Sequence, residues 1–210
     1  MERMRKAPPM LVLSPDDVGA AAYRRLALDR LIAPLAPGRA LPCDLTVSAP
    51  LRAAAVSRLV PARAALTGLS ALWLHGFVDG LCPLPLRVAV PRGAHPDPPP
   101  GVSSLAWAWH TDGQGWDSAS DASGVAAVSF AHAAATALRL DDLAVALPAV
   151  ARAVREGGCG VAEIDDAVRA GTGTLEGRQR QLSAWRALRR VLVSAATSTA
   201  LSATRGGASP

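Results

Sequence analysis

Apolar residues recur with helical spacing on both sides of an extended segment in residues 14–59. The segment Ser14–Asp17 offers an N-cap, a proline in the first turn and two carboxylates at the positive end of the helix dipole. A helix is therefore expected to run from it to about Leu31. The sequence after this helix predicts two short extended pieces around Pro37-Gly38, a pair that a type II turn prefers.

A helix followed by a hairpin is what a winged helix contains, so residues 10–60 are predicted to form a winged-helix-like DNA-binding region. A scaffolding helix from Ser48 or Pro50 to about Leu59 completes it. In such a region arginines on the helix and at the wing contact phosphates; the alternative is a surface hairpin with a solvated arginine. The expected phosphate contacts are Arg24, Arg25, Arg30 and Arg39. Expected to face inward are Val18, Ala22, Leu26, Ile32, Leu51, Val56 and Leu59, with Arg52 and Arg58 outside.

A short helix that ends at Gly76 is expected to bury an aromatic anchor. Leu69, Leu72 and Trp73 share one face at helical spacing, and Gly76 supplies the left-handed residue that terminates the helix. His75 falls in the last turn, where a cation is favoured. We therefore interpret it as a structural residue that caps the last carbonyls rather than as a catalytic histidine.

Alternating apolar positions predict strands in the middle of the chain, over residues 84–90 and 101–110, with a third short strand at Val125–Ser129. Residues 111–124 are rich in Asp, Ser and Gly and predict an exposed loop. On the second strand Leu105, Trp107 and Trp109 are expected on one side. They form either core or a base-stacking platform, and the absence of interleaved basic residues favours the core.

The C-terminal third predicts helices from Ser129 to about Leu140, Asp141–Glu156, Val161–Ala170 and Leu175–Val193, which with the strands gives an α+β fold. Residues 176–193 form a basic amphipathic helix. We interpret its basic face as a solvated surface; the alternatives are that this face binds nucleic acid or a protein partner. The composition of residues 194–210 predicts a disordered tail. The last helix is expected to turn Leu182, Trp185, Leu188 and Leu192 inward and Arg178, Arg180, Arg186, Arg189 and Arg190 outward.

Charge is segregated along the chain. Residues 1–63 carry ten basic and five acidic side chains, residues 64–150 three and seven, and residues 151–210 nine and five. Basic ends around an acidic middle suit a protein whose N-terminal part meets a polyanion, although solvated arginine faces give similar totals.

Three widely spaced cysteines, Cys43, Cys82 and Cys159, form no C-x-x-C pair, and the charged start of the chain is not a secretory signal. A reducing cytoplasm is the expected location. No run approaches the roughly 20 apolar residues that cross a bilayer, so no membrane span is expected.

Motifs of enzyme chemistry are missing from the sequence. The histidines His75, His95, His110 and His132 have no metal-ligand companions, so neither a metal nor another cofactor is expected. The pairs Asp141-Asp142 and Asp165-Asp166 are interpreted as helix caps. GTGTLEG at 171–177 follows a helix and lacks the lysine of a phosphate loop. A hydrolase that uses His75 or His110 with a nearby carboxylate stays open as a third class, without any supporting local spacing.

Residues 52–76, RAAAVSRLVPARAALTGLSALWLHG, and the later run AVSFAHAAATALRLDDLAVALPAVARAVREG resemble the AbiEi-type antitoxins of high-GC bacteria over roughly residues 10–175. The most specific element is Ser70-Ala71-Leu72-Trp73-Leu74-His75-Gly76, similar to the family's S-A-x-W-L-x-G, and the second is Thr136-Ala137-Leu138. Where relatives usually show aspartates, this chain has Arg139 and Arg152, which puts an acid-dependent toxin contact in doubt.

The resemblance implies an N-terminal winged helix that represses its own operon and, over residues 61–175, an α+β domain that opposes a nucleotidyltransferase toxin. Some relatives continue into a Vsr-like nuclease domain, which is not expected here because the sequence has no separated Asp/Glu-x-Lys pattern that could hold its magnesium. The resulting hypothesis is a non-enzymatic, antitoxin-like DNA-binding regulator of a type IV toxin–antitoxin system, with its own operator and the toxin as partners. The alternative is a noncatalytic interaction scaffold left from a Vsr-like nuclease fusion. The sequence does not define the oligomeric state.

Overall fold

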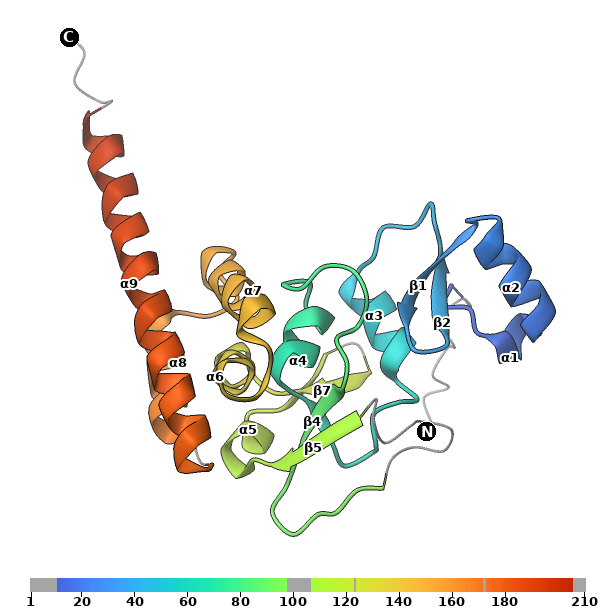
Figure 1. Ribbon diagram of the computed structural model, residues 1–210, viewed down its shortest axis with the longest axis horizontal. Coiled ribbons are helices and arrows are strands. Elements are labelled where there is room, and N and C mark those ends of the chain that lie inside the picture. Colours follow the sequence, from blue (N-terminus) through green and yellow to red (C-terminus); the bar gives the residue numbers. More distant parts are fainter. Residues whose placement is uncertain (1–10, 98–106, 123, 172, 206–210) are drawn as a thin grey trace, which may run out of the picture.

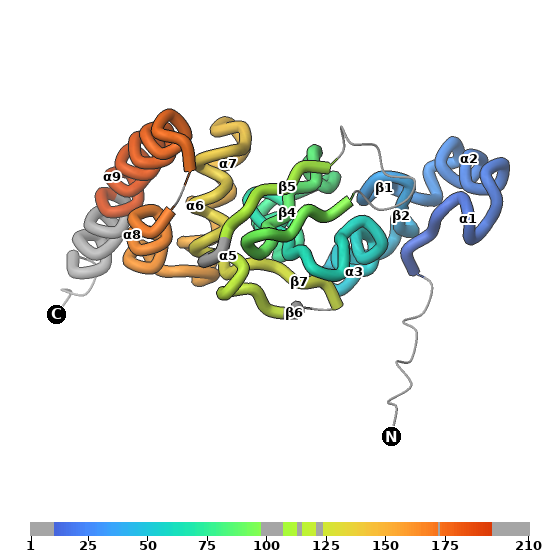
Figure 2. The backbone as a smooth tube through the Cα atoms, turned by 90° about the horizontal axis from the view of Figure 1, so that it is seen from below, coloured from blue at the N-terminus to red at the C-terminus, as the bar shows by residue number. Residues whose placement is uncertain are grey.

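The computed structural model describes residues 11–97, 107–122, 124–171 and 173–205 and has the predicted α+β fold. Figure 1 shows an elongated molecule with a helix pair and hairpin at one end, a small sheet in the middle and the C-terminal helices at the other end. Figure 2 shows the same order along the long axis, with α9 (Leu175–Arg205) beside α8 (Val161–Ala170) at the end away from α2 (Ala20–Leu28). No helix in the described residues is long and apolar enough to cross a membrane.

The first predicted helix is divided in two. Gly19 has φ of 83° and separates α1 (Pro15–Val18) from α2 (Ala20–Leu28). The predicted start is confirmed, because the Ser14 amide donates to Asp17 Oδ2 at 2.9 Å. The end is earlier than expected: Arg30 has φ of 56°, and the Leu31 amide donates to the Leu26 carbonyl at 3.0 Å, which closes the helix in a Schellman motif.

Neither of these helices has a buried residue. Of the positions predicted to face inward, Val18 and Leu26 are half-buried, whereas Ala22 is exposed. The pair lies at the tip of the molecule, so only one side of α2 meets other residues, and Tyr23 and Leu26 are half-buried there. Ile32, just after the pair, is buried as expected. The outer side of α2 faces solvent.

The predicted hairpin is confirmed. Strands β1 (Ile32–Ala36) and β2 (Arg39–Pro42) pair in antiparallel fashion, and Gly38 has the positive φ, 65°, that the turn requires. An isolated antiparallel β-bridge joins Leu13, which precedes the helices, to Ala40 on β2. Leu35 and Leu41 join the central core, which ties the hairpin to the rest of the chain.

A five-stranded mixed sheet forms the centre, in the order β5-β4-β3-β7-β6. The predicted strands correspond to β4 (Leu86–Val90), β5 (Trp107–Thr111) and β7 (Val125–Ala127), and residues 101–106 of the second predicted strand lie outside the described residues. Two strands of two and three residues, β3 (Ala65–Leu66) and β6 (Ser120–Ala122), were not predicted. The expected loop at 111–124 is wrong, because it holds α5 (Gly113–Asp117) as well as β6.

The start of α5 explains this difference. The Asp112 side chain accepts a hydrogen bond from the Gly115 amide at 2.8 Å, and the Trp116 amide donates to the Asp112 carbonyl at 2.9 Å. The Asp, Ser and Gly content that indicated a loop therefore includes a residue that initiates a helical turn. On β5, Trp107 is buried, whereas Trp109 is 39% exposed beside His95, and Leu105 lies outside the described residues.

The short helix with the aromatic anchor is confirmed as α4 (Gly68–Leu74), in which every residue is buried. Gly76 has φ of 93°, as its predicted role requires. The preceding helix, α3 (Ala49–Val56), buries Val56, but it also buries Arg52, which was expected in solvent. Arg52 Nη1 donates to the carbonyl oxygens of Trp73 and Val78, which need a donor where α4 ends.

Helices α6 (Phe130–Leu140), α7 (Leu143–Arg155) and α8 (Val161–Ala170) match the predicted segments. The last helix, α9 (Leu175–Arg205), is longer than predicted, and residues 194–205, expected to be disordered, are helical. Residues 191–204 are rich in alanine and contain neither glycine nor proline, so nothing in them ends a helix. Residues 206–210 lie outside the described residues.

The predicted inner face of α9 is confirmed, with Trp185 and Leu188 buried and Leu182 and Leu192 half-buried. Its predicted outer face needs one correction. Arg180 donates to the carbonyl oxygens of Arg139 and Asp141, where α6 ends. It is therefore a half-buried side chain that connects α9 to the end of α6 rather than a solvated one.

Candidate nucleic-acid interface

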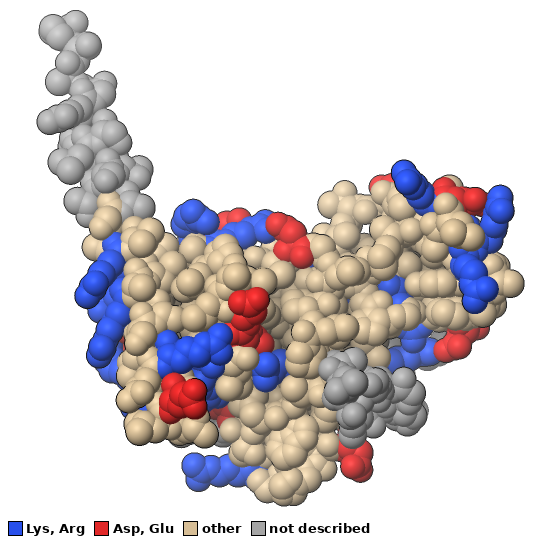
Figure 3. Space-filling model, in the orientation of Figure 1, with Lys and Arg blue, Asp and Glu red and all other residues tan. Residues whose placement is uncertain are grey.

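Three of the four predicted phosphate-binding arginines lie in solvent at the tip of the molecule. Arg24 and Arg25 project from the outer side of α2, and Arg30 follows at its C-terminal end. Figure 3 shows basic side chains gathered over this end, with acidic ones among them. Arg25 Nε lies 2.8 Å from Asp29 Oδ2, in a pair whose arginine side chain is 76% exposed. Such an exposed pair stabilises by well under about 1 kcal/mol, so Arg25 can exchange Asp29 for another anion.

Arg39 does not belong to this exposed group. Its side chain is only 15% exposed, and Nη1 lies 3.9 Å from Asp17 Oδ2. The hydrogen bond from Ser14 is the main cause that lowers the pKa of Asp17, with Arg39 contributing through its charge. The hairpin turn therefore directs Arg39 back toward α1 rather than outward as the tip of a wing.

The residues that carry the family resemblance belong to the core. Ser70, Ala71, Trp73 and Leu74 are at most 1% exposed. The Ser70 hydroxyl accepts from the Arg87 amide at 2.9 Å, and Trp73 Nε1 donates to the Gly80 carbonyl at 3.0 Å. The polar atoms of this element thus join α4 to β4 and to the loop after it.

His75 has a different structural role from the one predicted. Its ring packs edge-on against Phe130, with centroids 4.5 Å apart, while its backbone amide donates to the Ala71 carbonyl. Burial lowers the pKa of His75, so the ring is neutral at pH 7 and supplies no cation to the helix end. Its role is packing between α4 and α6.

A buried ion pair that the sequence did not indicate joins the sheet to the helices. Arg87 Nε lies 2.8 Å from Asp141 Oδ1, with side chains 14% and 9% exposed. Asp141 Oδ2 also accepts from the Leu69 amide at 2.8 Å, and Arg87 Nη2 donates to the Leu140 carbonyl. Only Asp142 of the predicted capping pair is a cap, because its side chain accepts from the Ala144 amide at 2.9 Å.

The interpretation of the second acidic pair, Asp165-Asp166, as a helix cap is also wrong. Asp165 and Asp166 lie in the middle of α8, whose N-terminal amide at Gly160 is bound by Glu163 instead. Asp165 accepts from Trp185 Nε1 and lies 3.4 Å from Arg189, so it holds α9 against α8. Neither pair has the geometry of an acid–base dyad, because each carboxylate serves a different structural contact.

The hydrolase alternative needs a histidine beside a carboxylate, and in the described part of the chain His110 lies next to Asp112. His110 Nε2 lies 3.7 Å from Asp112 Oδ2, and both side chains are mostly buried. His110 lowers the pKa of Asp112 to about 2, with the Gly115 amide contributing. In the described part of the chain, no group of three His, Cys, Asp or Glu side chains is placed to hold a metal ion.

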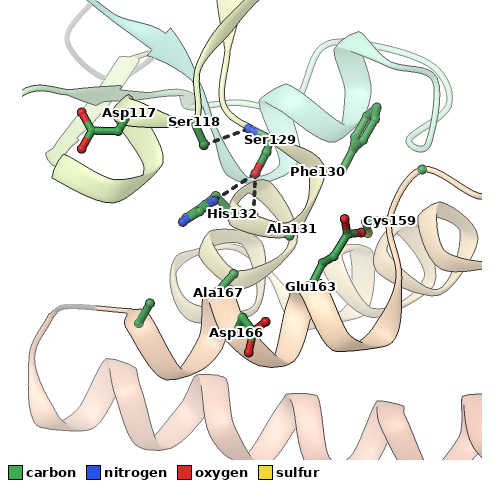
Figure 4. Close-up of a pocket in the computed structure, with 12 residues that line it drawn as sticks. Asp117, Ser118, Ser129, Phe130, Ala131, His132, Cys159, Glu163, Asp166 and Ala167 are labelled. Carbon is green, nitrogen blue, oxygen red and sulfur yellow. Dashed lines mark hydrogen bonds between the residues drawn. The ribbon is translucent and has the colours of Figure 1, made fainter.

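A groove of about 710 Å³ lies at the opposite end from α2, between α5, the start of α6 and α8. Figure 4 shows Ser129 and His132 on one side and Glu163 and Asp166 on α8 on the other. The Ser129 hydroxyl lies 2.9 Å from His132 Nδ1 and also accepts from the His132 amide as the N-cap of α6. The charged lining residues are carboxylates, which makes this groove repel a polyanion such as DNA.

Arg139 and Arg152, which stand where the AbiEi-type antitoxins that the chain resembles usually have aspartates, both make contacts within the chain. Arg139 is 8% exposed, and burial lowers its pKa. Arg152 pairs with Asp79 at 2.9 Å and with Glu156 at 2.7 Å. These positions are therefore part of the fold.

No protein-family model matches the chain, and no curated protein matches it. Among solved structures, the RV2827C protein from Mycobacterium tuberculosis is similar at 16% sequence identity, over 90% of this chain and 77% of that chain, with a TM-score of 0.42. A similarity this low carries no argument about fold or function.

Proposed function

We propose that this protein is a DNA-binding regulator whose contact surface is the outer side of α2 with Arg24, Arg25 and Arg30. The observation that carries the proposal is a nine-residue helix with no buried residue that holds arginines in solvent at the tip of the molecule. An α-helix with its side chains is about 10–12 Å in diameter, which fits the major groove of DNA, about 12 Å wide. The acidic groove lies at the far end, away from this surface.

The backbone of Arg30 supports the same surface. Arg30 adopts the left-handed conformation at φ of 56°, at the Schellman position where glycine is the usual residue. A side chain there costs on the order of 1 kcal/mol, and strain of this kind gathers at functional positions. We infer that arginine is present at this position for its charge rather than for the stability of the turn.

The antitoxin part of the proposal rests on the family resemblance. Under it, the sheet and the helices α4, α6 and α7 oppose a nucleotidyltransferase toxin, and the N-terminal unit acts as a degenerate winged helix that represses the operon. Because Arg139 and Arg152 make intramolecular contacts, the toxin would be bound through other residues. Co-expression with a nucleotidyltransferase encoded next to this chain tests this part: restored growth supports it, and unrelieved toxicity contradicts it.

The DNA-binding part is tested by fluorescence anisotropy with duplex DNA from upstream of the reading frame and with a scrambled duplex, from 50 to 200 mM salt. For each phosphate contact, raising the salt from 50 to 200 mM lowers the affinity about 3.5-fold. Over this range the affinity of the wild type should therefore fall about 40 times more than that of the triple variant Arg24→Ala/Arg25→Ala/Arg30→Ala, which lacks three contacts. The affinity of this variant at 50 mM salt should also be lower.

A charge-matched control is available in three exposed arginines far from α2. The variant Arg155→Ala/Arg186→Ala/Arg190→Ala removes the same charge from α7 and α9. It should bind DNA with the wild-type salt slope. If both triple variants weaken binding equally, the α2 surface is not the interface, and if the wild type binds the two duplexes equally and weakly, the protein is not a regulator of this operator.

A further inference from the structure

The outer side of α2 is not purely basic. Arg24 and Arg25 are flanked on the same side by Ala21 and Leu28, both in solvent, and the Leu28 side chain is 71% exposed. Leu28 follows Arg24 by four residues and Arg25 by three, so it is the helical neighbour of both. Leu28 is a large apolar side chain next to two arginines on the outer side of the helix, and no residue of the described chain covers it.

The opposite side of α2 already has its packing residues. Tyr23 and Leu26, which face the hairpin side, are half-buried, whereas the positions around Leu28 are exposed. Leu28 is therefore not a residue that supports the helix against the body. An exposed apolar side chain at this level of accessibility is itself unremarkable, but its placement between two phosphate-binding candidates gives it a defined direction toward the bound molecule.

We propose that Leu28, assisted by Ala21, reads thymine methyl groups in the major groove while Arg24 and Arg25 contact the phosphates on either side. The inference rests on the proposed DNA-binding function and adds a preference for sites with thymine at the contacted step. The 5-methyl group is the apolar feature that distinguishes thymine in the major groove, and small or branched apolar side chains are its partners. Charge complementarity selects DNA as the occupant, because the exposed Arg24, Arg25 and Arg30 lie close to the leucine along the chain.

The experiment compares the same upstream duplex with thymine or with uracil, which lacks only the methyl group. Wild-type protein should bind the uracil duplex about fourfold more weakly for each methyl group that is buried. Leu28→Ala should bind both duplexes with nearly equal affinity and should keep the wild-type salt slope, because no charge is removed. Leu175→Ala, which truncates a 76% exposed leucine at the start of α9, is the matched control and should retain the uracil penalty.

The outcomes separate the two proposals. Wild-type binding that is salt-dependent and sequence-preferring but equal for thymine and uracil overturns the role of Leu28 and leaves the regulator intact. A uracil penalty that persists in Leu28→Ala also overturns it. If sedimentation shows that wild-type protein is a dimer and Leu28→Ala a monomer, the leucine is covered by a second copy and the inference is wrong. Absence of DNA binding by the wild type overturns the proposed function, and this inference with it.

Discussion

Replacing Asp141 with asparagine should destabilise the protein strongly, whereas the same change at Asp142 should not. Asp141→Asn keeps the size of the side chain and removes its charge, which leaves Arg87 buried beside a neutral group. Arg87 keeps its hydrogen bond to the Leu140 carbonyl at 3.1 Å, but asparagine has a single acceptor oxygen, which cannot replace both carboxylate oxygens that accept from Arg87 Nε and from the Leu69 amide. Removing one partner of a buried ion pair costs about 3–5 kcal/mol, because the remaining charge stays out of water without compensation.

The adjacent aspartate provides the internal control. Asp142 caps α7 through the Ala144 amide and is exposed, and asparagine is as good an N-cap as aspartate. Asp142→Asn should therefore change the free energy of unfolding by less than about 0.5 kcal/mol. For a chain of this size about 1 kcal/mol corresponds to 2–4 °C, so Asp141→Asn should lower Tm by about 6–20 °C.

Thermal and urea denaturation at pH 7, followed by circular dichroism, measures both variants. The double variant Arg87→Met/Asp141→Asn adds a test of the pair itself: it should lose less stability than the sum of the single changes, because neither charge is left alone. Equal melting temperatures for Asp141→Asn and Asp142→Asn would refute the assignment of Asp141 to a buried ion pair that joins β4 to the helices.

Two further predictions follow from titratable groups, and one from the backbone. Because His110 holds the pKa of Asp112 at about 2, below its usual 3.8, this carboxylate stabilises the fold above about pH 4, and the stabilisation is lost as pH falls toward 2; Asp112→Asn should flatten the acid unfolding curve over that range, and an unchanged curve would contradict the contact. Burial raises the pKa of Cys82 to about 12 and of Cys159 to about 11, while Cys43 is exposed, so iodoacetamide at pH 8 should modify one thiol in native protein and three after unfolding; rapid modification in native Cys43→Ser would refute this. Arg30→Gly should raise stability by up to about 1 kcal/mol and weaken DNA binding; a loss of both would show that Arg30 acts through the fold.

The elements predicted well are those whose signals are local. Ser14 with Asp17, the Pro37-Gly38 turn and the glycine at 76 each fix a few neighbouring backbone dihedrals, and all three occur as expected. The helices α6, α7 and α8 have long apolar periodicity and were predicted within a few residues. Periodicity also found the inner face of α9, because Trp185 and Leu188 repeat at helical spacing.

The failures involve contacts between residues distant in sequence. Arg52 is buried because the carbonyls of Trp73 and Val78, more than 20 residues away, need a donor. Strand β3 has two residues, too few for a period, and exists because β4 and β7 lie on either side of it. Of the candidate site, the exposed Arg24 and Arg25 were predictable from helical spacing, whereas the inward turn of Arg39 depends on where α1 packs.

Arginine content alone is therefore a poor measure of the surface that a polyanion meets. Arg52, Arg87 and Arg139 are wholly or largely withdrawn from solvent, and Arg152 and Arg189 face carboxylates. Arginine suits such positions because its planar fork satisfies several carbonyl or carboxylate oxygens at once. The basic balance of this chain thus divides into arginines that hold helices together and arginines that remain in solvent. Arg24 and Arg25 on α2 are exposed and belong to the second group, so under the proposed DNA-binding function each would add directly to the salt dependence of binding.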